Sequence, residues 1–439
     1  MTYRRSAAVV AAGLSALGLF SACLAEEHAG VPPPRLTKVI VDGFFGAPRT
    51  KWLIPGQWVE NGEQRADPYE AGSVITYRER GVRLFAQEKG GPTRLAAVTA
   101  LGAEGLAALR EELQGRPGRL TIWCSAASLD SLPALPGEGE FSLGVASDSG
   151  PPGLSGAARF PTLAALWVGC RNTSDLQPLA ALERLRSLRL DACEKVTDLA
   201  PLTRLPNLTC LYLGGCTSVR DFSPLPKLTR LRALSLRDAK ALSDLAPVAA
   251  LRGLRVLDLT GCSSVKDLSA LADLGQLERL ELTHGVAVTD IAPLAKLHSL
   301  RYLSLHGCKT LADVGPLARL TQLKVLYLSG CEELADIGPL EALRDLEHLD
   351  IWGCNKVVDL GPLAGLERLE ELNLTSCRGI TSLAPLAALP RLRKVGLWGC
   401  HGVTDLRPLR RAARRGADVI LGNQELSEQL KRLREQTDF

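Results

Sequence analysis

The sequence lacks the motifs that mark the common enzyme classes. It contains no GxSxG, HExxH, Walker or GxGxxG pattern. Its six histidines are scattered, and none has a candidate nucleophile at a fixed spacing. It also has no CxxC or HxxxH pair, so the close ligand spacing of a zinc site is missing. These absences predict a protein that is not an enzyme and that has no cofactor and no metal.

An excess of charge of one sign is missing as well. The formal net charge is +4 for 439 residues, which gives no concentrated basic character and predicts no nucleic-acid partner. Hydrophobic residues make up 46% of the chain and charged residues 23%, a balance typical of a folded body rather than a disordered one. Aromatic residues are scarce at 5%, so the positions that do hold them are informative.

Long hydrophobic runs are limited to the N-terminus. Arg4 and Arg5 precede an apolar run over residues 6–20, and small residues follow before Cys23. This layout predicts a bacterial export signal over residues 1–25, since the run is too short for a membrane-spanning helix. The stretch LFSAC resembles a lipoprotein box, which implies a lipid on Cys23 as first mature residue. Cleavage after Ala25 is the alternative.

Export predicts the location of the protein. We expect a lipoprotein of the bacterial outer membrane or cell surface, otherwise a periplasmic or secreted protein. Contact with the membrane is then expected through the lipid anchor only.

One phrase, LxxLxLxxCxxxxDLxPLxxLxx, recurs down the chain. It starts at Leu185 and restarts every 23 residues up to Leu392. One further copy begins at Leu163 and is a residue short, so residues 163–414 contain eleven repeats. A fixed period of this length is typical of a solenoid.

The residue types within the repeat predict its local structure. The alternating leucines have the period of a short strand with one buried face, and parallel stacking of such strands buries a continuous core. Asp336 and its equivalents are expected to accept hydrogen bonds in the next turn, and Pro339 to fix φ at the start of a short helix. The repeats therefore predict an α/β solenoid with a parallel β-sheet.

Cysteine occupies one repeated position, in the turn after the strand. Ala239 and Gly285 take this position in two repeats, so it accepts small residues without a thiol. We expect packing rather than chemistry, with reduced and buried thiols, because parallel Cβ vectors on stacked strands do not suit a disulfide. The members are Cys170, Cys193, Cys216, Cys262, Cys308, Cys331, Cys354, Cys377 and Cys400.

The remaining segments flank the repeats. Residues 117–162 are predicted to hold two degenerate repeats, in which Leu120 and Leu143 stand 46 and 23 residues before Leu166. Residues 26–116 are predicted to form a small α+β domain, and residues 415–439 a C-terminal cap with a helix. Three details belong to these segments: a hairpin within residues 73–87, helical spacing of Leu106, Leu109 and Leu113, and the same spacing of Leu426, Leu430 and Leu433.

Residues between the inward leucines are expected to face the concave surface. Exposed aromatic side chains on a rigid surface are typical of recognition sites, although aromatic residues also favour strands for their own sake. The candidate partner-binding residues are Trp167, Tyr212, Tyr302, His306, Tyr327, His348, Asp350, Trp352 and Trp398.

The leucine pattern resembles leucine-rich repeat proteins, and its DLxPLxxL half is similar to the internalin-type bacterial repeat. This resemblance implies a horseshoe with the parallel β-sheet on its concave face, and a monomer that binds a protein or another macromolecule there. Cysteine replaces the usual asparagine, as in the cysteine-containing branches of the family. Two alternatives remain open: an intracellular adaptor similar to the repeat proteins of ubiquitin ligases, and an enzyme with its activity in residues 26–116.

Overall fold

The computed structural model describes residues 153–169, 172–284 and 288–435. Before residue 153 it describes Leu129 and the strands between residues 52 and 146. The chain divides into two compact units, residues 1–216 and residues 217–439. The predicted signal peptide with Cys23, the predicted helix at Leu106 to Leu113, and Cys170 lie outside the described residues.

Residues 1–216 contain a small antiparallel sheet and a larger, mostly parallel sheet. The small sheet has the order β1 (Trp52–Ile54), β2 (Gln57–Glu60), β3 (Glu63–Ala66). The larger sheet runs in chain order through β4 (Leu84–Ala86), β5 (Thr93–Val98), β6 (Gly118–Ser125), β7 (Phe141–Ala146), β8 (Leu163–Gly169), β9 (Ser187–Asp191) and β10 (Cys210–Tyr212). Strands β4 and β5 are antiparallel, and the later neighbours are parallel. The predicted hairpin of residues 73–87 lies mostly outside the described residues.

The register of the first strands differs in one step from the prediction. Leu143 pairs with Leu166, as the 23-residue period requires. Ile122, however, pairs with Leu143, so the predicted alignment of Leu120 with Leu143 was wrong by two residues. A two-residue shift keeps the same face buried, and the alternation pattern therefore could not reveal it. Strand β5, before residue 116, pairs with β6, after it, so the sheet continues across this position. The domain boundary predicted between residues 116 and 117 stays a prediction.

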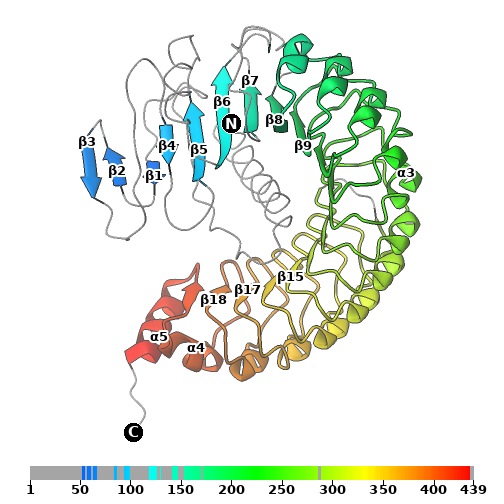
Figure 1. Cartoon of the computed structure of the whole chain (residues 1–439). Helices are drawn as coiled ribbons and strands as arrows, with labels where there is room; N and C mark the ends of the chain where they lie inside the picture. The colour runs from blue at the N-terminus through cyan, green and yellow to red at the C-terminus, as the bar shows by residue number, and fades with distance from the viewer. Residues whose placement is uncertain are drawn as a thin grey trace. The chain divides into compact units, whose positions relative to one another are not determined.

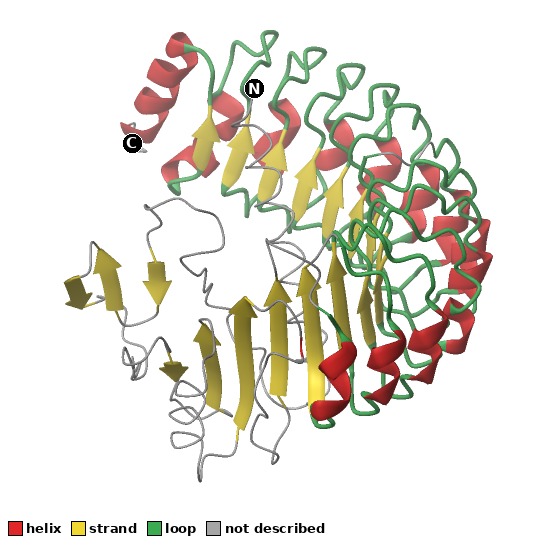
Figure 2. Cartoon of the chain, turned by 90° about the horizontal axis from the view of Figure 1, so that it is seen from above, coloured by secondary structure: helices red, strands yellow, loops and turns green. Residues whose placement is uncertain are grey.

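Residues 217–439 form a regular stack of parallel strands. In chain order these are β11 (Ala233–Ser235), β12 (Val256–Asp258), β13 (Arg279–Glu281), β14 (Tyr302–Ser304), β15 (Val325–Tyr327), β16 (His348–Asp350), β17 (Glu371–Asn373), β18 (Lys394–Gly396) and β19 (Asp418–Ile420). Successive strands pair at the 23-residue step, for example Arg279 with Tyr302. Only the last step is longer, since Lys394 pairs with Asp418. The strands lie side by side (Figure 2) and line the inner side of this unit, with the short helices outside (Figure 1).

The helical turns of the repeats are short, and most have a proline as their second residue. In residues 1–216 they are η2 (Ser155–Arg159), η3 (Gln177–Ala181) and η4 (Ala200–Arg204). In residues 217–439 they are η5 (Leu225–Lys227), α3 (Ala246–Ala249), η6 (Ser269–Asp273), η7 (Ala292–Lys296), η8 (Gly315–Arg319), η9 (Gly338–Ala342), η10 (Gly361–Leu363), η11 (Ala384–Ala388) and η12 (Arg407–Leu409). Leucines of strand and turn meet in the core between them, where Leu280, Leu282 and Leu294 are fully buried. No single repeat could bury these side chains alone, so the stack itself is the core.

Helix α4 (Arg410–Arg414) and helix α5 (Gln424–Glu435) close the C-terminal end of the second unit. Helix α5 lies where the leucine spacing predicts a helix, and Leu426, Leu430 and Leu433 are buried. The Gln429 side chain accepts a hydrogen bond from the backbone N–H of Leu406, so the helix is tied to the last repeat.

The repeated aspartates have the predicted structural role. Asp336 Oδ1 accepts a hydrogen bond of 2.7 Å from the backbone N–H of Gly338. The same contact recurs at Asp175, Asp198, Asp221, Asp244, Asp267, Asp290, Asp313, Asp359 and Asp405. At Asp267, the hydrogen bonds from Ser269 lower the pKa of the carboxyl group. Each carboxylate thus satisfies one N–H group at the start of a turn.

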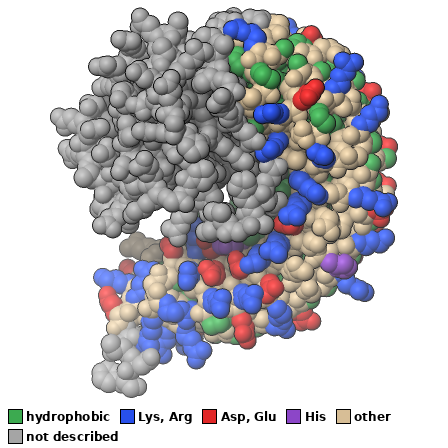
Figure 3. All heavy atoms as spheres, viewed as in Figure 1, with side chains coloured by type: hydrophobic (Ala, Val, Ile, Leu, Met, Phe, Trp, Pro, Cys, Tyr) green, Lys and Arg blue, Asp and Glu red, His purple; other side chains and the backbone are tan. Residues whose placement is uncertain are grey.

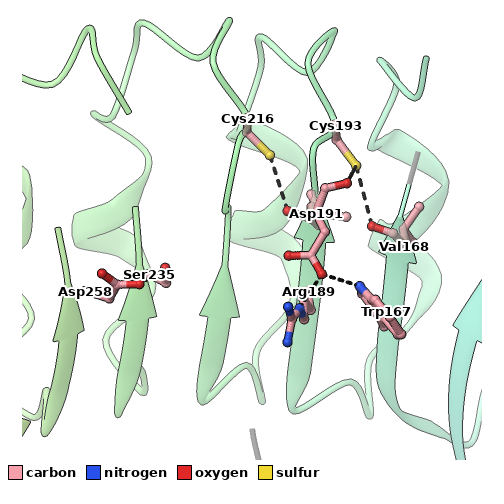
Figure 4. Close-up of polar contacts among 9 residues, drawn as sticks. Trp167, Val168, Arg189, Asp191, Cys193, Cys216, Ser235 and Asp258 are labelled. Atoms are coloured by element: carbon pink, nitrogen blue, oxygen red, sulfur yellow. Dashed lines mark hydrogen bonds and ion pairs between the residues drawn. The ribbon is translucent and has the colours of Figure 1, made fainter. Parts of the chain in front are cut away.

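The cysteine ladder consists of Cys193, Cys216, Cys262, Cys308, Cys331, Cys354, Cys377 and Cys400, all buried and free. Each thiol points to a backbone carbonyl of a preceding repeat: Cys193 to Val168 O and Cys216 to Leu190 O, both at 3.6 Å (Figure 4). Burial raises the pKa of Cys308 from 9.0 to about 11, so the thiol form persists at neutral pH. Cys210, which is not part of the ladder, is disulfide-bonded. The ladder is packing with weak hydrogen bonds, as expected.

Replacing Asp336 by alanine should lower the free energy of unfolding by about 1 kcal/mol, because the N–H of Gly338 loses its acceptor. Asp336→Asn keeps an oxygen at that place and should cost clearly less. Urea unfolding followed by circular dichroism measures both. Equal losses in the two variants would contradict the capping role.

The ladder thiols should react slowly in the folded protein. A shift of the Cys308 pKa from 9.0 to about 11 lowers its thiolate fraction at pH 8 about a hundredfold. Iodoacetamide should therefore alkylate the ladder cysteines slowly in the folded protein and rapidly once the protein is denatured, with no reductant added in either case. Mass spectrometry measures the modification. If denaturation released few free thiols, the reduced state of the ladder would be wrong.

Candidate interaction surface

Strands β13 to β17 present three rows of side chains on the inner face, the side of the strands that points away from the leucine core. In each strand the middle residue, such as Leu303 or Leu326, is buried, and the residues beside it point the other way. The first row contains Arg279, Tyr302, Val325, His348 and Glu371, and the second Glu281, Ser304, Tyr327, Asp350 and Asn373. The third row follows the strands and contains Thr283, His306, Ser329, Trp352 and Thr375.

Ring contacts join several of the predicted residues. The rings of Tyr302 and Tyr327 are 5.6 Å apart, tilted by 48°. The rings of His306 and Trp352 are stacked at 6.2 Å and 15°, although they belong to repeats two apart. Ser329 of the intervening repeat is small and buried, which allows the two rings to meet over it.

The central patch is defined here as Arg279, Glu281, His284, Tyr302, His306, Tyr327, Asp350 and Trp352. Five of these residues were predicted from the sequence, whereas Arg279, Glu281 and His284 were not among the candidates. Their spacing contains a signal that could have found them, because Arg279 stands one period before Tyr302 and pairs with it. Neighbours in a row touch, so a residue one period away from an aromatic residue is a candidate contact of its ring.

An arginine is held inside the central patch. The guanidinium carbon of Arg279 lies 3.5 Å from the centroid of the Tyr302 ring, and Nη2 donates to Glu281 Oε1. Burial raises the pKa of Glu281, and Arg279 acts in the opposite direction. Burial and the Glu281 charge also raise the pKa of Tyr302. The arginine is therefore stacked and ion-paired at once, and its charge is compensated within the patch.

The other carboxylate of the patch is less fully engaged. Asp350 Oδ1 accepts a hydrogen bond of 2.9 Å from the backbone N–H of Trp352. Burial raises the pKa of Tyr327, and the carboxylates of Asp350, Glu281 and Glu371 raise it further. Asp350 thus lies in the electrostatic surroundings of Tyr327, its cross-strand neighbour.

The two histidines of the patch meet edge to face. Their ring centroids are 4.3 Å apart at an angle of 74°. Burial, and then His284, lower the pKa of His306, so its ring is neutral at pH 7. His284 has a φ of 44°, at a place in the turn where Gly261, Gly307 and Gly330 stand in other repeats. A Cβ at Gly307 would lie 2.6 Å from Nδ1 of His284, so only glycine lets this ring lie where it does. Ala192, Asp238 and Ser376 have positive φ at the same place of their repeats, so this backbone conformation belongs to the turn and not to the patch alone.

Trp167 lies in residues 1–216 and belongs to a separate cluster. Its indole Nε1 donates to Asp191 Oδ2, and Arg189 donates to the same oxygen (Figure 4). The Arg189 guanidinium lies over the Trp167 ring, 5.3 Å from its centroid. The indole is half-buried, so only part of it is open to a partner. In the second unit, Ser235 donates to Asp258 at 2.9 Å (Figure 4), and both side chains are buried.

The expected exposure of Tyr212 was wrong. Tyr212 is 3% exposed, and the other two residues of β10, Cys210 and Leu211, are buried as well. Because β10 is buried on both faces, the ring of Tyr212 is already covered and offers no area to a partner.

His348 and Trp398 lie at the margins. His348 Nδ1 is 3.5 Å from Glu371 Oε2. Trp398 is 57% exposed and lies over Gly422, where a Cβ would come within 2.6 Å of its ring. It follows β18, two repeats beyond Trp352, so it extends the inner face rather than joining the patch.

Charges elsewhere on the second unit are mixed. Figure 3 shows acidic and basic side chains interspersed over the visible face, with basic side chains gathered toward the C-terminal end. Exposed residues at that end include Arg407, Arg410, Arg411, Arg415, Lys431 and Arg432. Within the described residues, no group of three or more potential ligands could hold a metal ion, and no helix is long and apolar enough to cross a membrane.

Comparison with known proteins gives the family. Residues 184–395 match the family described as leucine-rich repeat region. Among solved structures, internalin InlF of Listeria monocytogenes is similar at 26% identity and a TM-score of 0.50, covering 64% of this chain and 86% of that chain. No curated protein matches.

Two further structures are more distant. A leucine-rich repeat protein of Leptospira interrogans has 18% identity and a TM-score of 0.38, covering 71% of this chain and 94% of its own. The functional domain of InlJ of Listeria monocytogenes, described as including a cysteine ladder, has 20% identity and a TM-score of 0.38, covering 59% and 63%. The register, the buried leucines and the family match together give one conclusion: residues 184–395 form a leucine-rich repeat region, a class of repeat scaffold for protein interaction.

Proposed function

We propose that this chain is an exported, lipid-anchored protein that binds a protein partner through the inner face of residues 217–439, centred on Tyr327 and Trp352. The observation that supports this most directly is the central patch, in which one ring contact joins Tyr302 of β14 to Tyr327 of β15 and another joins His306, after β14, to Trp352, after β16. Trp352 at its edge is 44% exposed. Rigid aromatic area of this kind is what binding hot spots use, since few rotamers are frozen on binding.

The residues of this proposed site have unequal roles. Tyr327 and Trp352 provide the anchor, with Tyr302, His306 and Asp350 around them. His348 and Trp398 extend the surface along the strands. Trp167, half-buried beside Asp191, is a secondary contact in residues 1–216. We expect the protein to act as a monomer, because the inner face would be used for the partner.

The test is capture of a partner by the full chain and by a double variant, Tyr327→Ala with Trp352→Ala. Removal of both rings should weaken binding at least tenfold, because two central aromatic anchors commonly contribute about 2 kcal/mol or more. Surface plasmon resonance with the captured protein measures the change.

Val358→Ala is the matched control for the loss of apolar surface. Val358 is 62% exposed but lies in the segment between Cys354 and η10, outside the strands of the inner face. It should leave binding unchanged. If the double variant bound as tightly as this control, the central patch would not be the binding surface.

The export proposal depends on the N-terminal sequence, with Arg4, Arg5 and the apolar run before Cys23. Mass spectrometry of the protein from bacterial membranes should find an acylated Cys23 as first residue, and Cys23→Ala should abolish the acylated form. A mature chain that begins at Glu26 would support ordinary cleavage instead. A chain that retains Met1 would contradict export and favour the intracellular adaptor.

A further inference from the structure

The central patch already contains one bound guanidinium group, supplied by the chain itself. Arg279 lies over the Tyr302 ring at 3.5 Å and donates to Glu281 on its own strand. The ring supplies the negative face of its π-system, and the carboxylate supplies the opposite charge. Together they hold a planar cation from two sides.

Residues 1–216 repeat this arrangement independently. Arg189 lies over the ring of Trp167, its cross-strand neighbour, at 5.3 Å. It donates from Nε to Asp191, two residues further along the same strand. Each of the two units therefore uses the same combination once, an aromatic ring and a carboxylate around an arginine.

A third place on the inner face has the ring and the carboxylate but no arginine. Asp350 lies opposite Tyr327 on the neighbouring strand, and Trp352 follows it by two residues. His348 stands on β16 where Arg279 stands on β13. Asp350 Oδ1 is used by the backbone N–H of Trp352, and among the described residues Oδ2 has no hydrogen-bond partner.

The charges around this place are unbalanced. The first two rows of β13 to β17 carry three carboxylates, Glu281, Asp350 and Glu371, and one permanent cation, Arg279. The Arg279 charge is already taken up by Glu281. Glu371 faces His348, which is a cation only when protonated, and on its other side Lys394 of β18. Asp350 therefore remains the carboxylate of these rows that has no ion-pair partner among the described residues, and it lies beside the aromatic rings of Tyr327 and Trp352.

We propose that Tyr327, Asp350 and Trp352 bind the guanidinium group of an arginine in a basic segment of the protein partner. This rests on the proposed function of the central patch, and it names the chemistry that the patch selects. His306 stacks against one side of the Trp352 ring, and the remaining exposed area is open to a planar cation. Asp350 Oδ2 accepts hydrogen bonds from the N–H groups of this cation. A neutral side chain of the same shape, with a carbonyl group in place of the charged group, would lose both the contact of the cation with the ring and the charge-assisted hydrogen bond.

The experiment compares two blocked peptides of equal shape, (Gly-Arg)3 and (Gly-citrulline)3, by titration calorimetry with the full chain. Citrulline replaces the charged guanidinium by a neutral urea group. The arginine peptide should bind at least about tenfold more tightly, since a cation over a ring and a charge-assisted hydrogen bond are both lost in citrulline. Equal binding of the two peptides would overturn the proposal.

Asp350→Asn isolates the carboxylate without disturbing the turn. Asn373 shows that an amide works at this place, because its Oδ1 accepts from the backbone N–H of Thr375 at 3.1 Å. Asp350→Asn should remove most of the preference for arginine, whereas Glu367→Gln, an exposed carboxylate of an outer turn, should preserve it. Equal losses in the two variants would mean unspecific charge attraction and would also overturn the proposal. Trp352→Ala is a second variant at an exposed residue. It should weaken binding of the arginine peptide more than binding of the citrulline peptide.

The outcomes separate this proposal from the function on which it rests. If partner capture is lost in the Tyr327 and Trp352 double variant but Asp350→Asn binds normally, the patch is the binding surface and the arginine is not its ligand. If capture is unchanged in the double variant, the proposed function itself fails.

Discussion

Parallel stacking of leucine-rich strands at a 23-residue step is the constraint on which the other features depend. One strand of three residues cannot bury its leucine, but in the stack Leu280, Leu303 and Leu326 are buried side by side. A register slip of one residue would turn these leucines outward, so the register is strongly specified. Because inward positions are fixed, outward positions recur about 4.8 Å apart. Residues one period apart in sequence become neighbours on a surface.

The same constraint explains why most conspicuous residues of the repeat are not functional. Cys262 fills a turn and points to Leu236 O, and Asp267 completes the next turn by accepting from Ser269. Both contacts recur because each turn has the same unsatisfied backbone groups. His284 takes a place in the turn that glycine holds in several repeats and that Ala192, Asp238 and Ser376 hold in others, and there its ring meets His306. The side chain at this place, rather than the backbone conformation, is what differs from repeat to repeat.

Sequence alone predicted the parts of the structure that are local and repeated. The leucine register, the aspartate contacts and the buried thiols each follow from interactions within one or two repeats. Burial of Tyr212 does not, because it depends on what lies over β10 and not on its own repeat. The stacking of Arg279 on Tyr302 was missed for a different reason. A long side chain can reach several neighbours, and the neighbour that it contacts depends on charge and rotamer rather than on the position in the repeat.

The difference between Arg279 and His348 decides what the inner face can select. Where Arg279 is present, the carboxylate of Glu281 is neutralised inside the protein and gains nothing from a partner. Where His348 stands at the corresponding strand position, Asp350 is only partly buried, and its Oδ2 has no hydrogen-bond partner among the described residues. A partner that covers Asp350 must desolvate this carboxylate, which costs free energy unless a cation arrives with it. An apolar segment could cover Trp352 equally well but would leave the carboxylate buried and unpaired. At the proposed site, the negative charge would therefore act mainly by rejecting partners without a matching cation, and this would give an aromatic surface its specificity.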